Sequence, residues 1–362
     1  DDSNGAIGDV MSFAVHLIEK TAPEVQLDAE TLAERILDAV VAAGYGEFDG
    51  IIPATAPILG NAGLEHLKKI TNAWAETLPQ EHELERYRSW GISSTTPEEM
   101  VERNRKSTSS VILADIADAQ GDVDAYMARY SDEQLTYGTI APDVARRLLD
   151  AGRVEEAMQI VLNSREAEKG SSHRMFHHDL DAVYEECLEK LGKTDELKQH
   201  LWDTFTQTLI ESALRKYLKL LPDFDDIEAE ERALDFAAQY PYLSTAINFL
   251  LKWPAPARAA KIIEARADEL DGNSYYTMTE AADALEAEYP LAATLMRRSM
   301  IEDTLMGAKH KRYRYAAKHL AECAANDTAI TDYGDFPPHE QFVATLKAVH
   351  SRKHGFWGLV SD

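Results

Sequence analysis

The most unusual chemistry in the sequence lies in segment 309–319, which holds five lysines or arginines, two histidines and two tyrosines but no acidic residue. On a helix, several of these cations would share one face beside Tyr315, whose ring could stack on a base. Segment 309–318 is therefore a candidate binding site for nucleic acid or another anion. Its cations are Lys309, Lys311, Arg312, Arg314 and Lys318.

A competing interpretation gives segment 309–318 a structural role. The chain has a formal net charge of −26, and an acidic body repels a phosphate backbone. From Leu291 to the end there are 10 Lys or Arg against 8 Asp or Glu, whereas the preceding residues have 27 against 55. The cations of this tail can therefore pair with the chain's own carboxylates, with arginine stems packed over aromatic rings. The overall charge favours this second interpretation.

Two histidines spaced four residues apart, His173 and His177, would lie on one face of a helix and are weak candidates for metal binding. Zinc needs a third or fourth ligand, and no recognisable one lies nearby in the sequence. The acidic run 223–231 lacks the glycine and the spacing of a calcium loop, so we interpret it as the start of a helix. We therefore predict no metal and no cofactor.

Sequence motifs of common enzymes are missing. The chain contains no Gly-x-Ser-x-Gly, no His-Glu-x-x-His and no Walker sequence, and its cysteines do not form a Cys-x-x-Cys pair. The sequence therefore favours a protein without enzymatic activity. An active site built from residues of distant helices stays open as an alternative.

The two cysteines, Cys187 and Cys323, are too few for a disulfide framework and suit a reducing compartment. Both stand in helix-like contexts, where we expect them to be buried. No apolar run approaches the roughly 18 residues that span a bilayer. We therefore expect a cytoplasmic protein without a membrane partner.

The elements that must position these residues are predicted to be helices. Alanine, leucine, glutamate, lysine and arginine fill the segments between breakers, and these residues favour helices. From Phe176 to Leu191 the apolar residues recur with the spacing of one helix face. Strand-like alternation is nearly absent. The predicted fold class is all-α, without a substantial β-sheet.

An internal repeat marks the joints between helices. Gly121, Gly152 and Gly192, which are 31 and 40 residues apart, each follow a helical pattern and precede a polar step and a second helix with an early acid. Each glycine is expected to take the left-handed conformation that ends the first helix. The pattern predicts an α-solenoid of antiparallel helical hairpins.

The turn sequences resemble the inter-helix Gly-x-x-x-x-Ala of tetratricopeptide repeats. Gly152 and Ala157 match this spacing, whereas Gly121 and Ala125 are one residue closer, and the third unit has Leu197 in place of the alanine. The intervals between the glycines are irregular but close to the 34-residue period of that family. The resemblance therefore implies tetratricopeptide-like hairpins with irregular spacing.

Three regions follow from these patterns. Residues 1–90 are predicted to form an N-terminal helical unit with an irregular insert over residues 44–63. Residues 97–221 are predicted to form the hairpin repeats. Residues 227–362 are predicted to form a C-terminal hairpin region, which includes segment 309–318 and two Tyr-Pro steps at Tyr240 and Tyr289.

Four stretches resemble an uncharacterised bacterial family of helical-repeat proteins, a domain of unknown function. They are residues 44–53, 217–228, 312–320 and 350–357. The resemblance implies a bacterial source and more helical sequence upstream of Asp1, which fits a chain that does not begin with methionine. The closing segment is also similar to the tail of bacterial SWIM zinc-finger proteins, but their zinc motif is absent here. Neither resemblance supplies an activity.

Two functions remain open at this stage. The first is a helical-repeat scaffold that binds an unknown protein or peptide, since an acidic surface prefers a basic or amphipathic partner. The second is an accessory protein that binds nucleic acid or another anion through segment 309–318.

Overall fold

The computed structural model describes residues 6–25, 27–43, 47–88, 95–169 and 178–360. The chain divides into two compact units, Asp1–Lys193 and Thr194–Asp362, and each is described separately below. This division falls inside the predicted 97–221 region. The boundaries predicted from the sequence stay a prediction.

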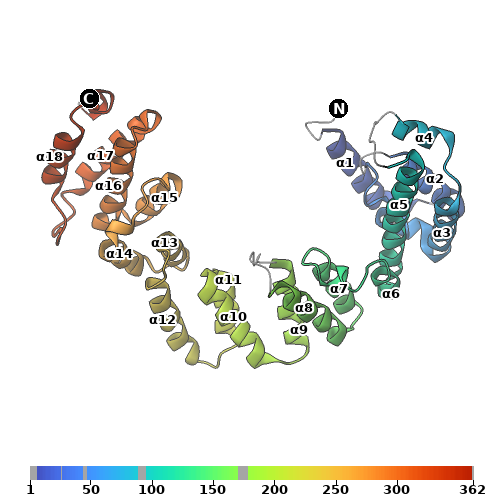
Figure 1. Cartoon of the computed structure of the whole chain (residues 1–362). Helices are drawn as coiled ribbons and strands as arrows, with labels where there is room; N and C mark the ends of the chain where they lie inside the picture. The colour runs from blue at the N-terminus through green and yellow to red at the C-terminus, as the bar shows by residue number, and fades with distance from the viewer. Residues whose placement is uncertain (1–5, 26, 44–46, 89–94, 170–177, 361–362) are drawn as a thin grey trace. The chain divides into compact units, whose positions relative to one another are not determined.

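The all-α fold class is confirmed, because the described residues form helices and no strand (Figure 1). Unit 1 contains α1 (Ala6–Thr21), α2 (Ala29–Ala42), α3 (Ile51–Glu76), α4 (Glu81–Arg88), α5 (Pro97–Gln120), α6 (Val123–Met127), α7 (Ala141–Asp150), α8 (Val154–Glu168) and α9 (His178–Lys190). Unit 2 contains α10 (Thr194–Thr208), α11 (Glu211–Lys219), α12 (Asp225–Ala238), α13 (Leu243–Lys252), α14 (Pro256–Ala265), α15 (Tyr275–Leu285), α16 (Pro290–Met306), α17 (Tyr313–Asn326), α18 (His339–His350) and α19 (His354–Val360). Short 3-10 turns, Ala22–Glu24, Gln134–Thr136, Ala267–Glu269 and His310–Arg312, join some of them.

The predicted joint glycines do end helices. Gly121, Gly152 and Gly192 have φ angles of 67°, 76° and 67°, in the left-handed region. After each one, the next backbone N–H bonds to a carbonyl five residues back, as in Asp122 to Ala117 at 2.8 Å and Arg153 to Leu148 at 2.8 Å. The helices on either side of Gly121 and Gly152 pack against each other. Gly192 lies at the division between the units, so the packing of its two helices stays a prediction.

The irregular insert predicted for residues 44–63 is wrong for residues 51–63. Helix α3 begins at Ile51, and residues 44–46 lie outside the described part of the chain. Pro53 is tolerated because it falls in the first turn, where its missing N–H would have had no intrahelical partner. The backbone breaks at Gly60, with φ 54° and ψ −174°, and the helix resumes beyond this kink. The density of glycine and proline therefore marks a kinked helix, not a loop.

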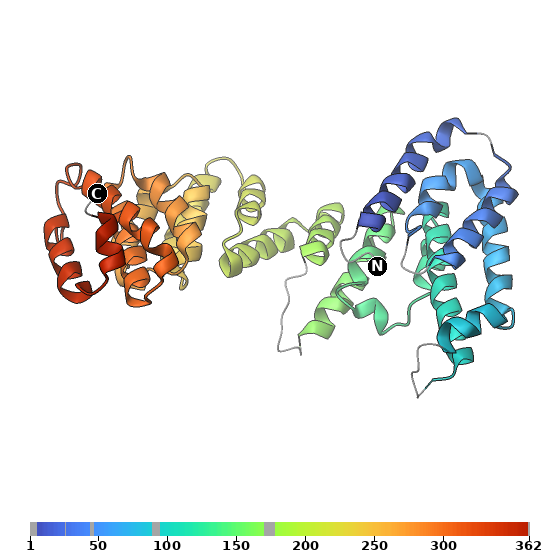
Figure 2. The same cartoon turned by 90° about the horizontal axis from the view of Figure 1, so that it is seen from above.

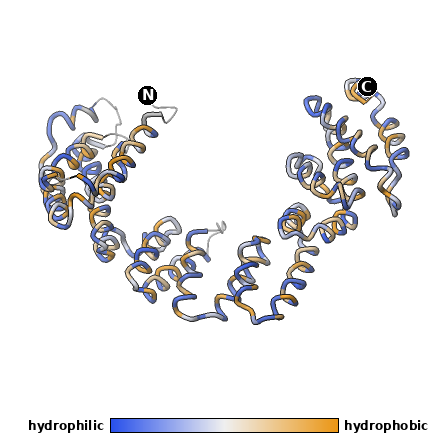
Figure 3. Tube along the Cα trace, turned by 180° about the vertical axis from the view of Figure 1, so that it is seen from behind, coloured by the Kyte–Doolittle hydropathy of each residue, from blue (hydrophilic) through white to orange (hydrophobic). Residues whose placement is uncertain are grey.

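Each unit encloses its own core. In unit 1, α2, α3 and α5 pack around buried aliphatic residues that include Ala33, Leu67 and Ile112. Hydrophobic residues recur along the helices between hydrophilic ones, as expected for amphipathic helices (Figure 3). Helix α5 starts cleanly, because Thr96 accepts a hydrogen bond from the Glu99 amide while the Glu99 carboxylate accepts one from the Thr96 amide.

Helix α16 is the central helix in the C-terminal part of unit 2. It is buried on most of its surface and packs against α14, α15 and α17 (Figures 1 and 2). One core continues from Phe205 to Met300, and a second surrounds Ile301, Tyr313 and Phe356. Of the two predicted Tyr-Pro steps, the second supplies Pro290 as the first residue of α16, whereas Pro241 precedes α13 by two residues.

We expect Gly152→Ala to lower the free energy of unfolding by about 1–2 kcal/mol, the usual penalty for a side chain in the left-handed conformation. A Cβ at this position would meet no atom within 4 Å, so the loss would report the backbone alone. Gly152→Asn is the matched variant and should lose less, because asparagine tolerates this region. Urea unfolding followed by circular dichroism measures both, and equal stability of Gly152→Ala and wild type would contradict the assignment.

Candidate functional site

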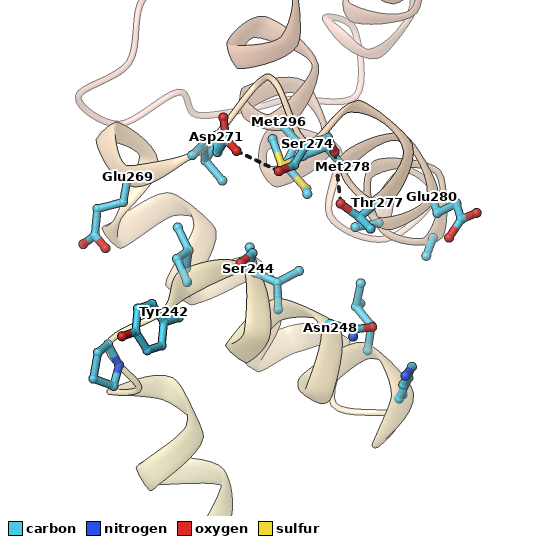
Figure 4. Close-up of a pocket in the computed structure, with 18 residues that line it drawn as sticks. Tyr242, Ser244, Asn248, Glu269, Asp271, Ser274, Thr277, Met278, Glu280 and Met296 are labelled. Atoms are coloured by element: carbon cyan, nitrogen blue, oxygen red, sulfur yellow. Dashed lines mark hydrogen bonds between the residues drawn. The ribbon is translucent and has the colours of Figure 1, made fainter. Parts of the chain in front are cut away.

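A cavity of about 520 Å³ lies in unit 2 between α13 and α15 (Figure 4). Its buried lining is apolar, with Leu243 and Ile247 from α13, Met278 from α15 and Met296 from α16. Methionine side chains are flexible and polarisable, so they adapt to ligands of different shape. The cavity is therefore suited to enclose an apolar group.

The cavity exists because the facing positions of the two helices carry small residues. On α15 and the residue before it, Ser274, Thr277, Ala281 and Ala284 recur at intervals of three or four and line the same space. Ser244 lies opposite them on α13. Larger side chains at these positions would fill the cavity. The sequence pattern does not reveal this site, because small residues at helical spacing are equally typical of close helix packing.

A tight turn anchors one edge of the cavity. The Asp271 carboxylate accepts a hydrogen bond from the Ser274 hydroxyl at 2.7 Å and another from the Asn273 amide at 3.0 Å (Figure 4). Gly272 lies directly on α16, where a Cβ would stand 2.2 Å from the carbonyl oxygen of Ser299. The Ser299 hydroxyl in turn donates to the carbonyl of Leu270 at 2.9 Å. The turn is thus fixed to the central helix.

The charges around the opening are mostly negative. Glu269, Asp271 and Glu280 line it together with one cation, Lys252, which lies 3.5 Å from the carboxylate of Glu211. A hydrogen bond from Arg266 lowers the pKa of Glu269, so this carboxylate stays ionised at neutral pH. Histidine and cysteine are not among the described residues that line the cavity. The arrangement favours binding of an apolar group next to a cation.

Arg297 of α16, which directly follows Met296 of the cavity lining, is 1% exposed and contacts carboxylates of α15 and α17. Its Nη2 lies 2.8 Å from Oδ1 of Asp283 on α15 and 3.0 Å from Oε2 of Glu286, the residue that caps the C-terminal end of α15. Its Nε lies 3.0 Å from Glu322 Oε2 of α17, an ion pair without the alignment of a hydrogen bond. Burial opposes the charge of Arg297, but hydrogen bonds and charges from Glu286, Glu322 and Asp283 outweigh it and raise its pKa.

A buried histidine extends this contact. His319 Nδ1 lies 2.9 Å from Glu322 Oε2, and burial lowers the pKa of His319 although the bond to Glu322 opposes the shift. The neutral ring is therefore favoured at pH 7, with Nδ1–H assigned as donor to the carboxylate. Burial raises the pKa of Glu322, but the contacts with His319 and Arg297 outweigh it and lower the value overall. The three side chains together hold α17 against α16.

The predicted cations of segment 309–318 divide into two groups. Lys309 pairs with Asp303 at 2.7 Å and Lys318 with Glu322 at 3.3 Å, as the structural interpretation requires. The other three cations have no carboxylate partner in the described part of the chain. Arg312 and Arg314 lie over tyrosine rings, and Lys311 is exposed. Anion binding by this segment stays a prediction.

The histidines proposed as weak metal candidates, His173 and His177, lie outside the described residues. Within the described ranges, no group of three or more His, Cys, Asp or Glu side chains is placed to hold a metal ion. Both cysteines are fully buried. Burial raises the pKa of Cys187 to about 11 and that of Cys323 to about 12, so both thiols are protonated at neutral pH.

Two all-helical units with an apolar, acid-rimmed cavity define the class of the protein. The model of a family of unknown function, DUF6880, matches residues 1–359, and the chain belongs to this family. Comparisons with curated proteins and with solved structures gave no match. The resemblances to tetratricopeptide repeats and to the SWIM tail stay predictions. Across the described ranges, no helix has the length and apolar character required to cross a bilayer.

We expect Gly272→Ala to destabilise unit 2 by about 1–3 kcal/mol, the usual cost of an overpacked methyl group. The added Cβ would collide with backbone of α16 and push away the turn that borders the cavity. Gly358→Ala is the matched control, because a Cβ there meets no atom within 4 Å. Thermal unfolding measures the difference, and an unchanged midpoint for Gly272→Ala would show that the turn does not lie on α16 as described.

Proposed function

We propose that the protein binds a segment of a partner protein, with an apolar side chain of the partner in the cavity between α13 and α15. The observation that carries this proposal is the cavity's combination of a buried apolar lining and an acidic opening. Its volume of about 520 Å³ falls in the range of roughly 300–1,000 Å³ that is typical of ligand sites. A basic residue beside the apolar anchor would complement Asp271 and Glu280, whereas Glu269 is already paired with Arg266.

Binding is favoured over catalysis because the described lining offers no histidine or cysteine to act as base or nucleophile. Two of its hydroxyls are engaged locally: Ser274 donates to Asp271, and Thr277 donates to the backbone carbonyl of Ser274 at 3.0 Å. Asn248 and Tyr242, by contrast, lie at the opening (Figure 4). They supply polar groups that can orient a peptide backbone.

The wider setting of this proposal is a tetratricopeptide-like scaffold in the cytoplasm of a bacterium. The left-handed glycines at the ends of α5 and α7 support the repeat architecture. The two buried, protonated thiols are compatible with a reducing compartment.

The proposal is tested with synthetic nine-residue peptides that carry leucine or phenylalanine flanked by lysine, compared with the same peptides carrying glutamate. We expect the lysine series to bind and the glutamate series to bind at least about tenfold more weakly, because the opening is acidic. Fluorescence anisotropy with labelled peptides measures both.

Ala284→Leu is the diagnostic variant, because Ala284 is exposed and lines the cavity, so that a leucine would occupy the space without disturbing the core. We expect it to weaken peptide binding about tenfold or more, the equivalent of about 1.4 kcal/mol. Ala321→Leu, on the exposed face of α17, is the matched control and should bind as wild type does. Failure of every lysine peptide at millimolar concentration, or equal binding by Ala284→Leu, would refute the proposal.

A further inference from the structure

A surface of unit 2 outside the cavity combines neighbouring tyrosines with cations that make no ion pair within the described ranges. It consists of Tyr275 and Tyr276 on α15, Lys311 and Arg312 in the 3-10 turn, and Arg314 and Tyr315 on α17, and we call it the aromatic–basic patch. None of these six residues lines the cavity between α13 and α15. The sequence analysis identified the α17 side of the patch, but the fold adds the two tyrosines from α15.

The tyrosines form a connected group. The ring of Tyr275 lies 5.9 Å from that of Tyr276 and 5.5 Å from that of Tyr315, between centroids. Tyr276 is 83% exposed and Tyr315 is 37% exposed, so their rings are available at the surface. An exposed tyrosine ring is a sequence-tolerant surface for stacking a nucleic-acid base.

The cations of the patch are oriented but not neutralised. The Arg312 guanidinium lies over Tyr275 at 5.7 Å and donates to Asn273 Oδ1 at 3.3 Å. The Arg314 guanidinium lies over Tyr315 at 4.5 Å. Lys311 is exposed and makes no ion pair within the described ranges. These three cations are therefore able to bind phosphate groups.

Two acidic residues beside the patch, Asp303 and Glu322, already have partners. Asp303 is bound by Lys309, whose Nζ also contacts Asn273 at 2.8 Å. Glu322 is bound by Arg297 and by Lys318. Pairing removes much of the local repulsion that these carboxylates would exert on a phosphate. Glu280, one helical turn after Tyr276 on α15, makes no ion pair within the described ranges.

We propose that the aromatic–basic patch binds single-stranded nucleic acid, with a base stacked on Tyr276 and phosphates held by Lys311, Arg312 and Arg314. A single strand is favoured over a duplex, because only unpaired bases can lie against the rings. The few cations predict weak binding that does not depend strongly on sequence. This site is separate from the cavity of the proposed function.

The test uses a fluorescein-labelled twelve-nucleotide oligothymidylate and the full chain, with binding followed by anisotropy. We expect micromolar affinity at 50 mM salt and a loss of about tenfold to twentyfold at 200 mM, since about three phosphate contacts give a logarithmic slope near −2. A twelve-base-pair duplex should bind more weakly than the single strand.

Two variants, each with a matched control, distinguish the contribution of base stacking to binding from that of charge. Tyr276→Ala should weaken oligonucleotide binding about fivefold or more, whereas Tyr242→Ala, which removes an exposed tyrosine at the cavity, should not. The double variant Lys311→Glu/Arg314→Glu should abolish binding, whereas Lys219→Glu/Lys261→Glu, with the same change in net charge on other exposed sites of unit 2, should reduce it only slightly.

The proposal is overturned if the duplex binds as tightly as the single strand, if Tyr276→Ala binds as wild type does, or if the two charge variants lose affinity equally. Inorganic polyphosphate serves as a competitor without bases. If it displaces the oligonucleotide at the same phosphate concentration that unlabelled oligonucleotide requires, the site recognises anions only and base stacking is rejected. Circular dichroism melting of each variant confirms that the helices remain folded.

Discussion

The buried guanidinium of Arg297 is the contact on which both proposed sites depend. It extends from the central helix α16 to the carboxylates of Asp283 on α15, of Glu286 at the C-terminal end of α15, and of Glu322 on α17. When the side-chain amide of Asn326 is oriented with its oxygen toward Arg297, this oxygen accepts a hydrogen bond from Arg297 Nη1 at 3.2 Å. In the same orientation the amide nitrogen donates to Glu286 Oε1 at 3.0 Å. A desolvated charge is stable only when it is paired in this way. One side chain therefore fixes two helices to a third.

The two helices held by Arg297 carry the functional surfaces. Helix α15 supplies one wall of the cavity and the tyrosines of the aromatic–basic patch, and α17 supplies Arg314 and Tyr315 of that patch. The cavity and the patch are thus formed by different residues of the same small set of helices. Since Glu322 is bound to Arg297, Lys318 and His319, its negative charge is largely balanced next to the patch. The same network supports the fold and leaves the neighbouring cations available.

Sequence patterns predicted the helical class and the glycines that end α5, α7 and α9, because these features depend on local spacing and backbone conformation. They did not predict the Arg297 network, in which one residue of α16 pairs with acids that precede and follow it in the sequence. The chain contains 63 aspartates and glutamates, and sequence spacing alone does not show which of them will contact Arg297. For the basic segment, the sequence offered two interpretations. Among the residues that the structure describes, Lys309 pairs with a carboxylate, whereas Lys311 does not. The cavity was not predicted, because small residues at helical spacing, such as Ala281 and Ala284, occur both beside a cavity and in a closely packed helix pair.

Hydrogen–deuterium exchange of Arg297→Met tests the central claim most directly, with Arg258→Met as the control that removes a more exposed arginine of unit 2 paired with Glu231 and Asp235. If Arg297 holds α15 and α17 on α16, the backbone amides of α15 and α17 should exchange about tenfold faster or more in Arg297→Met than in the wild type. The amides of unit 1 in Arg297→Met, and the amides of α15 and α17 in Arg258→Met, should keep their wild-type rates. Unchanged protection of α15 and α17 in Arg297→Met would contradict the account.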